Sequence, residues 1–529
     1  MHKNIGFSYF LRAVLANWAS VFAGILLFSS AACAQVSDDT DRNMSQMANY
    51  QNECAIIKNP ANQLQLFAAC NNSTGGLFAA RSIDGGLTWV YPDPSKTIAN
   101  GVNLALGPAA CCDPALAWDT FGNLYITYID STVNHIVTLL SMDGGQTFAT
   151  LASFGPASVD QPTVTADSGE VWIVWNQANQ MVARGAAVTG LGTANIGAFG
   201  PLQNIPGTAG CSFGDITIAP NGAVVQVCES PAGGPGPANL LVNTKADGLG
   251  ANPFAAAIAA TATNVGGFAP IPAQSRRTID SEAGLAYDRN PASPHFGRLY
   301  LVYTDSGAVG SADTDIMLRF SDTDGAAWSN PPIRVNDDAT TRSQFLPRIA
   351  SDRLSGNIAV CWHDARNSPG NNTMQEFCTI AKPTGASPAF MANAPISDGT
   401  SDGNGSNPSV AGQLDIQFGD YSGLTYHQGF AHPAWADDSN STGDNPDGKV
   451  RYDAYTDRVR VDPCRPLSDK LDDLEQQIQD MQDALASGEI PAPPRTPAKI
   501  AAVRAAIRRL MAQARNLRAQ LKRCRQQNP

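Results

Sequence analysis

The chain has 529 residues, of which 43% are hydrophobic and 16% charged, and its net charge is −12. This composition excludes a disordered protein, and the length exceeds that of one small domain. The negative charge argues against nucleic acid as a partner, because its phosphates would be repelled.

The N-terminus has the pattern of an export signal. Lys3 and Arg12 precede an apolar stretch at 21–28, and small residues follow at 32–34. We therefore expect a secreted or periplasmic protein. A lipid anchor on Cys33 is the less favoured alternative, because the residues before it fit the usual lipidation box poorly. No segment is long and apolar enough to predict an integral membrane span.

Strand patterns recur through residues 50–461 as seven units of three strands. The first strands of these units are predicted at 55–58, 113–118, 162–166, 216–219, 284–287, 347–351 and 421–426. This spacing predicts an all-β propeller of seven blades, with six as the alternative count. The other predicted parts are the signal (1–34), a separate N-terminal segment (35–49) and a helical hairpin (462–529).

An eight-residue turn pattern occurs in the first two units. It is SIDGGLTW at 82–89 and SMDGGQTF at 141–148, and a degenerate copy at 321–328 has Thr323 and Ala327 in place of Asp and Thr. A short Asp side chain accepts hydrogen bonds from nearby backbone amides, the glycines supply positive φ, and the final aromatic packs on a sheet. The pattern therefore predicts tight turns at the corners of blades.

These turns resemble the Asp-box (BNR) repeats of the sialidase superfamily, whose fold is a β-propeller. In that family the box forms the turn between the third and fourth strands of a blade, away from the active site. The resemblance covers roughly residues 50–460 and implies an architecture rather than a reaction. Catalytic sialidases have six blades, so the predicted count of seven departs from them.

The catalytic residues of sialidases are not recognisable in this chain. Family members that cleave sialic acid hold its carboxylate with three arginines and use a Tyr–Glu pair and an aspartic acid. No Arg-Ile-Pro motif stands before Ser82, and 345–349 contains similar letters in another order. We therefore do not expect sialic acid cleavage. Tyr421, Tyr452 and Tyr455 are interpreted as strand or core aromatics rather than as nucleophiles.

Eleven cysteines less Cys33 leave ten, an even number that suits disulfides in an oxidising compartment. The strand positions predict one bridge in each of three blades and one across the helical region. These bridges are Cys54–Cys70, Cys211–Cys228, Cys361–Cys378 and Cys464–Cys524. Cys111 and Cys112 are adjacent, and the sequence leaves open whether they form a vicinal disulfide or two free or otherwise paired thiols.

After Pro463 apolar residues repeat every three or four positions, from 467 to 485 and from 500 to 521. This period predicts two helices, and the proline-rich segment 491–497 separates them. The first helix carries mostly acids and the second only bases, so we expect an ion-paired antiparallel hairpin with a solvated outer face. The hairpin is also the predicted contact surface if the protein forms oligomers.

Acidic residues recur where, in a propeller, inner strands begin and second strands end, which is one face of the ring. Asp113, Asp160, Asp364 and Asp420 are predicted to converge on one pocket there, with Arg348 and Arg366, and these six are the candidate catalytic residues. Three interpretations of the acids remain open. They cap backbone amides, bind a structural Ca²⁺, or act as acid and base groups on a glycan. No other cofactor is expected.

We therefore predict an exported, glycan-recognising protein of sialidase-like fold, with glycoside hydrolase activity as the catalytic version of this hypothesis. The alternative is a non-catalytic scaffold that binds a protein or an extracellular polymer. Either way, the expected partner is a carbohydrate or another extracellular polymer. Trp172, Trp175, Trp362 and Trp435 lie on second strands, where one facing the channel mouth would stack on a sugar ring and the others would be core.

Overall fold

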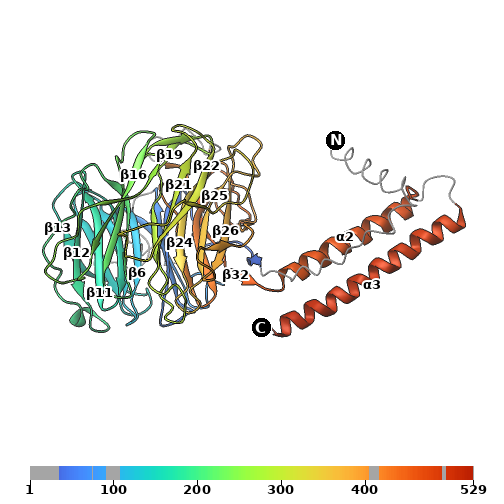
Figure 1. The fold of residues 1–529 in the computed structure, drawn as a ribbon, viewed down its shortest axis with the longest axis horizontal. Helices are drawn as coiled ribbons and strands as arrows, with labels where there is room; N and C mark the ends of the chain where they lie inside the picture. The colour runs from blue at the N-terminus through green and yellow to red at the C-terminus, as the bar shows by residue number, and fades with distance from the viewer. Residues whose placement is uncertain (1–34, 74–75, 91–107, 404–415, 491–495, 528–529) are drawn as a thin grey trace. The chain divides into compact units, whose positions relative to one another are not determined.

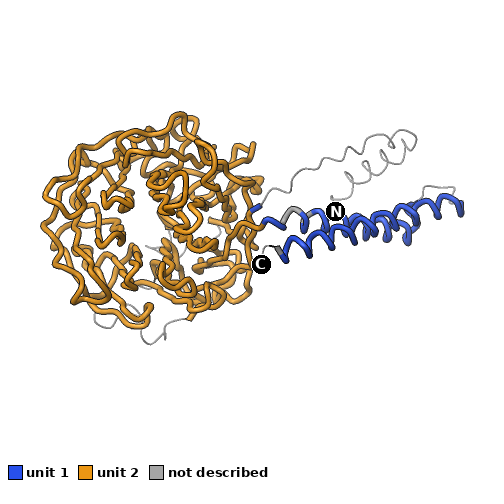
Figure 2. The backbone as a smooth tube through the Cα atoms, turned by 60° about the horizontal axis from the view of Figure 1, so that its bottom comes forward, with its two compact units in different colours: residues 1–35, 463–529 blue, residues 36–462 orange. Residues whose placement is uncertain are grey.

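The computed structural model describes residues 35–73, 76–90, 108–403, 416–490 and 496–527 (Figure 1). The chain divides into two compact units, one of Val36–Asp462 and one of Met1–Gln35 with Pro463–Pro529 (Figure 2). The predicted export signal and Cys33 lie outside the described residues.

The described residues of the larger unit form seven antiparallel sheets arranged in a ring (Figure 2). Blade one contains β3 (Gln51–Lys58), β4 (Leu66–Asn72) and β5 (Leu77–Ser82); blade two contains β6 (Ala110–Trp118), β7 (Leu124–Asp130), β8 (Ile136–Ser141) and β9 (Ala149–Phe154). Blade three contains β10 (Val159–Asp167), β11 (Glu170–Gln177), β12 (Gln180–Ala187) and β13 (Gln203–Asn204), and a short 3₁₀ turn, η2 (Thr193–Asn195), precedes β13. Blade four contains β14 (Ser212–Ile218), β15 (Val224–Ser230), β16 (Ala238–Lys245) and β17 (Ile258–Thr263).

The remaining blades complete the ring. Blade five contains β20 (Gly284–Tyr287), β21 (Leu299–Ser306), β22 (Thr314–Ser321) and β23 (Ile333–Arg334); blade six contains β24 (Gln344–Ser351), β25 (Ile358–Asp364), β26 (Gln375–Lys382), β27 (Ala389–Phe390) and β28 (Ala394–Pro395). Blade seven contains β29 (Gly423–His427), β30 (Phe430–Asp437), β31 (Asp453–Thr456) and β32 (Val459–Asp462). The predicted all-β propeller fold and the count of seven blades are confirmed.

Blade seven is closed by the N-terminal end of the propeller. Two short strands, β1 (Gln35–Ser37) and β2 (Arg42–Asn43), form its outer edge, where β2 pairs antiparallel with β31 and β1 lies beside β32. Met44 follows β2 and is fully buried. The segment 35–49, which we expected to be separate, thus belongs to the propeller, and the two ends of the propeller segment meet in one sheet.

A two-stranded hairpin is inserted between blades four and five. It consists of β18 (Ala269–Ile271) and β19 (Gln274–Ile279). Gln274 Nε2 donates to the Gly419 carbonyl at 2.9 Å, and the Arg276 and Arg277 amides donate to Gln417 Oε1 at 2.8 and 2.9 Å. The hairpin therefore joins the connection between blades four and five to the segment that precedes β29 in blade seven.

Most inner strands begin with the same backbone irregularity. A non-glycine residue takes a positive φ at the start of six of the seven described inner strands, and these residues are Glu53, Asp113, Gln161, Phe213, Glu282 and Leu346. In five of the six blades the pairing with the second strand shifts its register at this point. Such β-bulges bend a strand and re-aim the side chains around it.

The three eight-residue turns follow the third strands β5, β8 and β22. In the first, Thr88 donates to Asp84 from its amide at 2.9 Å and from its hydroxyl, and the Gly86 amide donates to Ser82 Oγ at 2.9 Å. The turn after β8 repeats these bonds. In the degenerate turn, Thr323 Oγ1 accepts the Ala327 amide at 2.9 Å in the place of the missing carboxylate. The predicted corner turns are confirmed in geometry.

The cores lie between neighbouring blades and contain the largest side chains. Trp172, Trp175, Trp362 and Trp435 are each at most 1% exposed. All four are therefore core residues, and none is exposed enough to stack on a sugar. Their burial follows from the pleat of the second strands, whose side chains point alternately into the two inter-blade layers.

The smaller unit contains two helices, α2 (Arg465–Ser487) and α3 (Pro497–Gln527). Their apolar residues form one cluster, and the Thr496 hydroxyl accepts the Lys499 amide, so Thr496 caps the start of α3. Among described residues, one ion pair links the helices, between Arg518 and Glu475 at 2.8 Å. The expected ion-paired interface is therefore sparse. No helix in the described part of the chain is long and apolar enough to cross a membrane.

The structure contains five disulfides. The bridges Cys54–Cys70, Cys211–Cys228, Cys361–Cys378 and Cys464–Cys524 are those predicted from the sequence. Cys111 and Cys112 form the vicinal bridge that the sequence left open. Cys361 and Cys378 face each other directly across β25 and β26, as the spacing of the two strands required.

Candidate functional site

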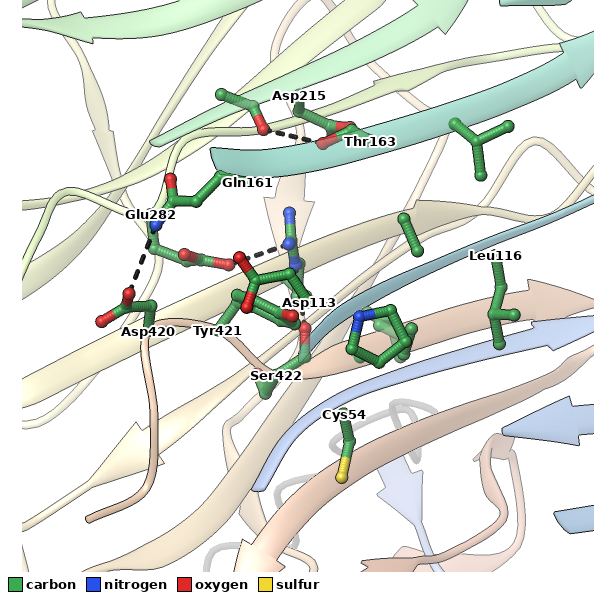
Figure 3. A pocket seen from close by; sticks show the side chains of 18 of the residues that line it. Cys54, Asp113, Leu116, Gln161, Thr163, Asp215, Glu282, Asp420, Tyr421 and Ser422 are labelled. Atoms are coloured by element: carbon green, nitrogen blue, oxygen red, sulfur yellow. Dashed lines mark hydrogen bonds and ion pairs between the residues drawn. The ribbon is translucent and has the colours of Figure 1, made fainter. Parts of the chain in front are cut away.

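A cavity of about 220 Å³ lies at the centre of the ring, where the inner strands of all seven blades converge (Figure 3). The polar side chains that line it are those of Asp113, Gln161, Thr163, Asp215, Glu282, Arg348, Asp420, Tyr421 and Ser422. Four of the six positive-φ residues at the strand starts also line it. In four blades the positive-φ residue therefore lies at the cavity, and two of the four, Asp113 and Glu282, are acidic.

Four carboxyls and one guanidinium form the first charged group, which we call the Asp420 group: Glu53, Asp113, Asp160, Asp420 and Arg277. Arg277 is ion-paired with Asp420, and the Asp420 amide donates to Glu53 Oε1 at 3.0 Å. A side-chain hydrogen bond joins Asp160 to Asp113. Blades one, two and three and the segment before β29 thus bring four acids together around a single cation, which the inserted hairpin supplies.

Burial and mutual repulsion keep protons on this group. Burial and the charges of Asp160 and Asp420 raise the pKa of Asp113 to about 7. Burial raises the pKa of Glu53 still further, and burial with the Asp420 charge raises that of Asp160. The pKa of Asp420 is raised by burial and pulled back by Arg277. Near neutral pH the group therefore holds both protonated and ionised carboxyls.

Glu282, Asp215 and Arg348 form a second charged group, which we call the Glu282 group. Arg348 Nη2 lies 3.0 Å from Glu282 Oε1, and Arg348 Nε donates to the Ser422 carbonyl at 2.9 Å. The Leu285 amide donates to Asp215 Oδ2 at 2.9 Å. Burial raises the pKa of Glu282 to about 8 against the opposing Arg348 charge, and burial also raises that of Asp215.

Two further acids, Asp280 and Glu229, are buried close to the Glu282 group and do not line the cavity. The Ser281 amide donates to Glu229 Oε2 at 2.9 Å, and the Glu282 amide donates to Asp280 Oδ1. Burial raises the pKa of Glu229 to about 7, and burial with the Glu282 charge raises that of Asp280 well above its usual range. These acids therefore extend the set of buried, proton-holding carboxyls beyond the cavity wall.

Tyr421 lies on the cavity wall between the two groups (Figure 3). The Arg348 guanidinium stands 5.9 Å from its ring centroid. Burial and the nearby carboxylates raise the pKa of Tyr421 well above its usual range, so the phenol stays protonated. Tyr452 and Tyr455 are fully buried and fit the interpretation as core aromatics, whereas for Tyr421 that interpretation is wrong.

The structure brings four of the six candidate catalytic residues together. Asp113, Asp420 and Arg348 line the cavity, and Asp160 joins them through its bond to Asp113. Asp364 and Arg366 are not among the lining residues, although we predicted that Asp364 would converge on the same pocket.

Asp364 instead holds a turn at the end of β25. It accepts Trp362 Nε1 at 2.7 Å and the Arg366 amide at 2.8 Å, and it pairs with the Arg366 guanidinium at 2.8 Å. The same spacing recurs in blade seven, where Asp437 accepts Trp435 Nε1 at 2.9 Å. An acid two residues after a second-strand Trp thus caps its own blade, and this structural role explains why the prediction for Asp364 and Arg366 failed.

Sequence reasoning missed Glu53, Gln161, Arg277 and Asp280. Glu53 had a usable signal, because Glu53-Cys54-Ala55 has the same offset from its strand as Asp113-Pro114-Ala115. Arg277 had none, since it belongs to a short hairpin outside the seven repeating units.

In the part of the chain that the structure describes, no three His, Cys, Asp or Glu residues are arranged to hold a metal ion. His427 lies 3.9 Å from Asp352, and His432 Nε2 lies 3.1 Å from the Gly85 carbonyl.

No protein-family profile and no curated protein matches the chain. Solved structures that match include an α-L-arabinofuranosidase from Fusarium graminearum bound to an iminosugar (TM-score 0.39, 10% identity, 65% of this chain and 98% of that one). A Streptococcus pneumoniae sialidase, NanB, matches with a TM-score of 0.38 and 12% identity over 80% of this chain and 70% of that one. A Dyadobacter fermentans protein of unknown function matches with a TM-score of 0.38 and 10% identity, over 81% and 100% of the two chains. Sialidases thus appear among the matches, as the sequence resemblance predicted, but scores this low carry no argument about ligand or reaction.

Proposed function

We propose that this protein is an exported glycan-binding protein with glycoside hydrolase activity at the central cavity. The observation that carries the proposal is the hydrogen-bonded pair Asp113 and Asp160 on a small cavity with acids of graded pKa. Glycosidases need one protonated carboxyl to protonate the leaving oxygen and one ionised carboxylate to stabilise the positive charge that develops on the sugar. Asp113 and Glu282 are the candidates for the first role, and Asp160 and Asp420 for the second.

The charge of the cavity indicates what kind of sugar it takes. Asp113, Asp215, Glu282 and Asp420 line it, against a single lining arginine, Arg348. An anionic sugar would meet this excess of carboxylates, so a neutral or amino sugar is the expected ligand. The volume of about 220 Å³ lies below the roughly 300–1,000 Å³ of drug-sized sites, which favours one sugar ring rather than a longer segment.

The test is a glycan array together with hydrolysis of chromogenic glycosides by the purified full-length chain. We expect activity on a neutral or amino sugar, with a rate that falls as pH rises past 7–8, because Asp113 and Glu282 then lose their protons. Asp113→Asn and Glu282→Gln should each reduce the rate by at least roughly a hundredfold.

Asp364→Asn is the matched control, because Asp364 caps a turn outside the cavity. It should lower stability and leave the rate per folded molecule unchanged. The proposal would be refuted if the wild-type protein neither bound nor hydrolysed any glycan, or if Asp113→Asn were as active as the wild type.

Export is part of the proposal and is supported by the five disulfides, which are typical of an oxidising compartment. N-terminal sequencing of the protein recovered from its native cells should find the chain starting at Gln35. A fatty-acylated Cys33 at the start would instead establish the lipoprotein alternative.

One observation favours the second candidate, a scaffold that binds a polymer or another protein. All nine basic residues of α3 are exposed, and one of them, Arg518, has an ion pair among the described residues. Such a surface attracts polyanions or an acidic partner, including the acidic α2 of a second copy. A salt-dependent dimer in sedimentation at low ionic strength, with both glycan assays silent, would select this candidate.

A further inference from the structure

The vicinal disulfide stands directly before an acid of the cavity. Cys111 and Cys112 lie in β6, and the next residue, Asp113, takes a φ of 57° and lines the cavity. The pairing of β6 with β7 shifts its register on both sides of Cys112, whereas the other bulged inner strands show one shift. The disulfide thus coincides with the most irregular start of an inner strand.

Asp113 depends on this irregularity for its contacts. Its amide donates to Asn71 Oδ1 at 2.8 Å, and the Asn71 side chain donates to Glu53. Its carboxyl is hydrogen-bonded to the side chain of Asp160. A left-handed conformation is unfavourable for a non-glycine residue, so the neighbouring structure must hold it in place. The disulfide ring restricts the backbone rotation of Cys111 and Cys112, the two residues immediately before Asp113.

The five disulfides differ in their access to solvent. The six cysteines of the three cross-strand bridges are at most 1% exposed, and in the hairpin bridge Cys464 is 2% exposed while Cys524 is partly exposed. Cys111 and Cys112 are both partly exposed. Exposed disulfides are the ones that thiols attack, because the incoming sulfur must approach along the S–S axis.

We propose that Cys111–Cys112 is a thiol-exchange site that positions Asp113 and releases it on reduction. A thiolate of a small-molecule thiol attacks one sulfur, forming a mixed disulfide and expelling the other cysteine as a thiolate. A second thiol molecule then attacks the mixed disulfide, which leaves both cysteines reduced and the two thiol molecules joined as a disulfide. Two electrons pass to the protein, and Asp113 loses the constraint that holds it beside Asp160.

The first experiment measures which disulfide opens. The oxidised full-length protein is treated with increasing glutathione, alkylated with iodoacetamide, and mapped by mass spectrometry. We expect Cys111 and Cys112 to be alkylated roughly tenfold faster than any cross-strand cysteine. If Cys111 and Cys112 were alkylated no faster than Cys464 and Cys524, the proposal of an exchange site would be refuted.

The second experiment measures the consequence for Asp113, and it does not depend on a glycan ligand. A raised carboxyl pKa makes the unfolding free energy fall with pH. Other buried acids such as Glu229 and Glu282 also contribute to the slope between pH 4 and pH 8, so it is the change of this slope on opening the disulfide that reports on Asp113. The Cys111→Ser/Cys112→Ser variant and the glutathione-reduced protein should both show a shallower slope than the oxidised protein. The Cys464→Ser/Cys524→Ser variant is the matched control and should keep the oxidised slope.

The positioning role rests on the proposed function only where activity is concerned, and the outcomes separate the two. A shallower slope in a protein without any glycan activity would support the positioning role and refute the hydrolase. Activity that survives reduction, together with an unchanged slope, would refute the positioning role and leave the hydrolase standing.

Discussion

At the scale of single residues, the cavity depends on side chains whose backbone is held in an unfavourable conformation. Six inner strands begin with a non-glycine residue at positive φ, and three of the six residues are acidic. Asp113 could be found from the sequence, because it stands where an apolar strand begins. The sequence could not reveal Arg277, which reaches Asp420 from a hairpin that no repeat marks. The positions of the repeating strands and of the acids at their starts are therefore predictable. The arginine that neutralises those acids is not.

Stability should fall as pH rises because Asp113 holds its proton in the folded state. Its pKa is raised from 3.8 to about 7, so its contribution is complete below pH 4 and is lost as pH rises through the folded pKa. Asp113→Asn, which cannot ionise, should be more stable than wild type by roughly 1–3 kcal/mol at pH 8 and similar to it at pH 4.

Thermal unfolding between pH 4 and pH 8 is the measurement. The control is Asp364→Asn, which removes one partner of the Arg366 ion pair and should destabilise the protein at pH 8. A wild-type curve that rises with pH over this range would contradict the proton-holding cavity.

At the scale of elements, sequence and structure agree best where hydrogen bonds are local. The turn after β8 could be read directly, because Asp143 accepts amides and a hydroxyl within four residues. The degenerate turn keeps its shape with Thr323, which offers one neutral acceptor instead of a carboxylate. The acid at the end of each second strand was harder to interpret, because an aspartate there can either accept hydrogen bonds within a turn or line a cavity.

Removing the turn acceptors should therefore have unequal effects. Asp143→Ala loses charge-assisted hydrogen bonds from Thr147 and Gln146 and should cost about 2–3 kcal/mol, while Thr323→Ala loses a neutral bond and should cost about 1 kcal/mol. Urea midpoints of the two variants provide the comparison. Equal losses would show that the carboxylate contributes nothing beyond the turn shape.

At the scale of the whole molecule, the ring is closed by strands from both ends of the propeller segment. The strands β1 and β2 contain three and two residues, which is too short for a period of two to be detected. This is why the sequence placed residues 35–49 outside the propeller. The number of blades was predictable, because every blade repeats the same pattern of strands. The closure was not predictable, because it occurs in only one blade.

A chain that begins at residue 50 should be markedly less stable than one that begins at Gln35. It loses β1, β2 and the buried side chains of Val36 and Met44, and apolar burial alone predicts a loss of about 3–6 kcal/mol. The melting temperature of the propeller is the measurement. As a control, a chain that ends at Asp462 should keep the melting temperature of the propeller, because the helices belong to the other compact unit. Similar losses in both truncations would contradict the assignment of closure to β1 and β2.

The shared seventh sheet has a consequence for biosynthesis. Its outer strands are made early and its other strands almost four hundred residues later, since β2 starts at Arg42 and β29 at Gly423. The ribosome therefore synthesises the residues of the first six blades before the ring can close. Until then β1 and β2 lack their partners in the seventh sheet, so closure of the ring is a late step of folding.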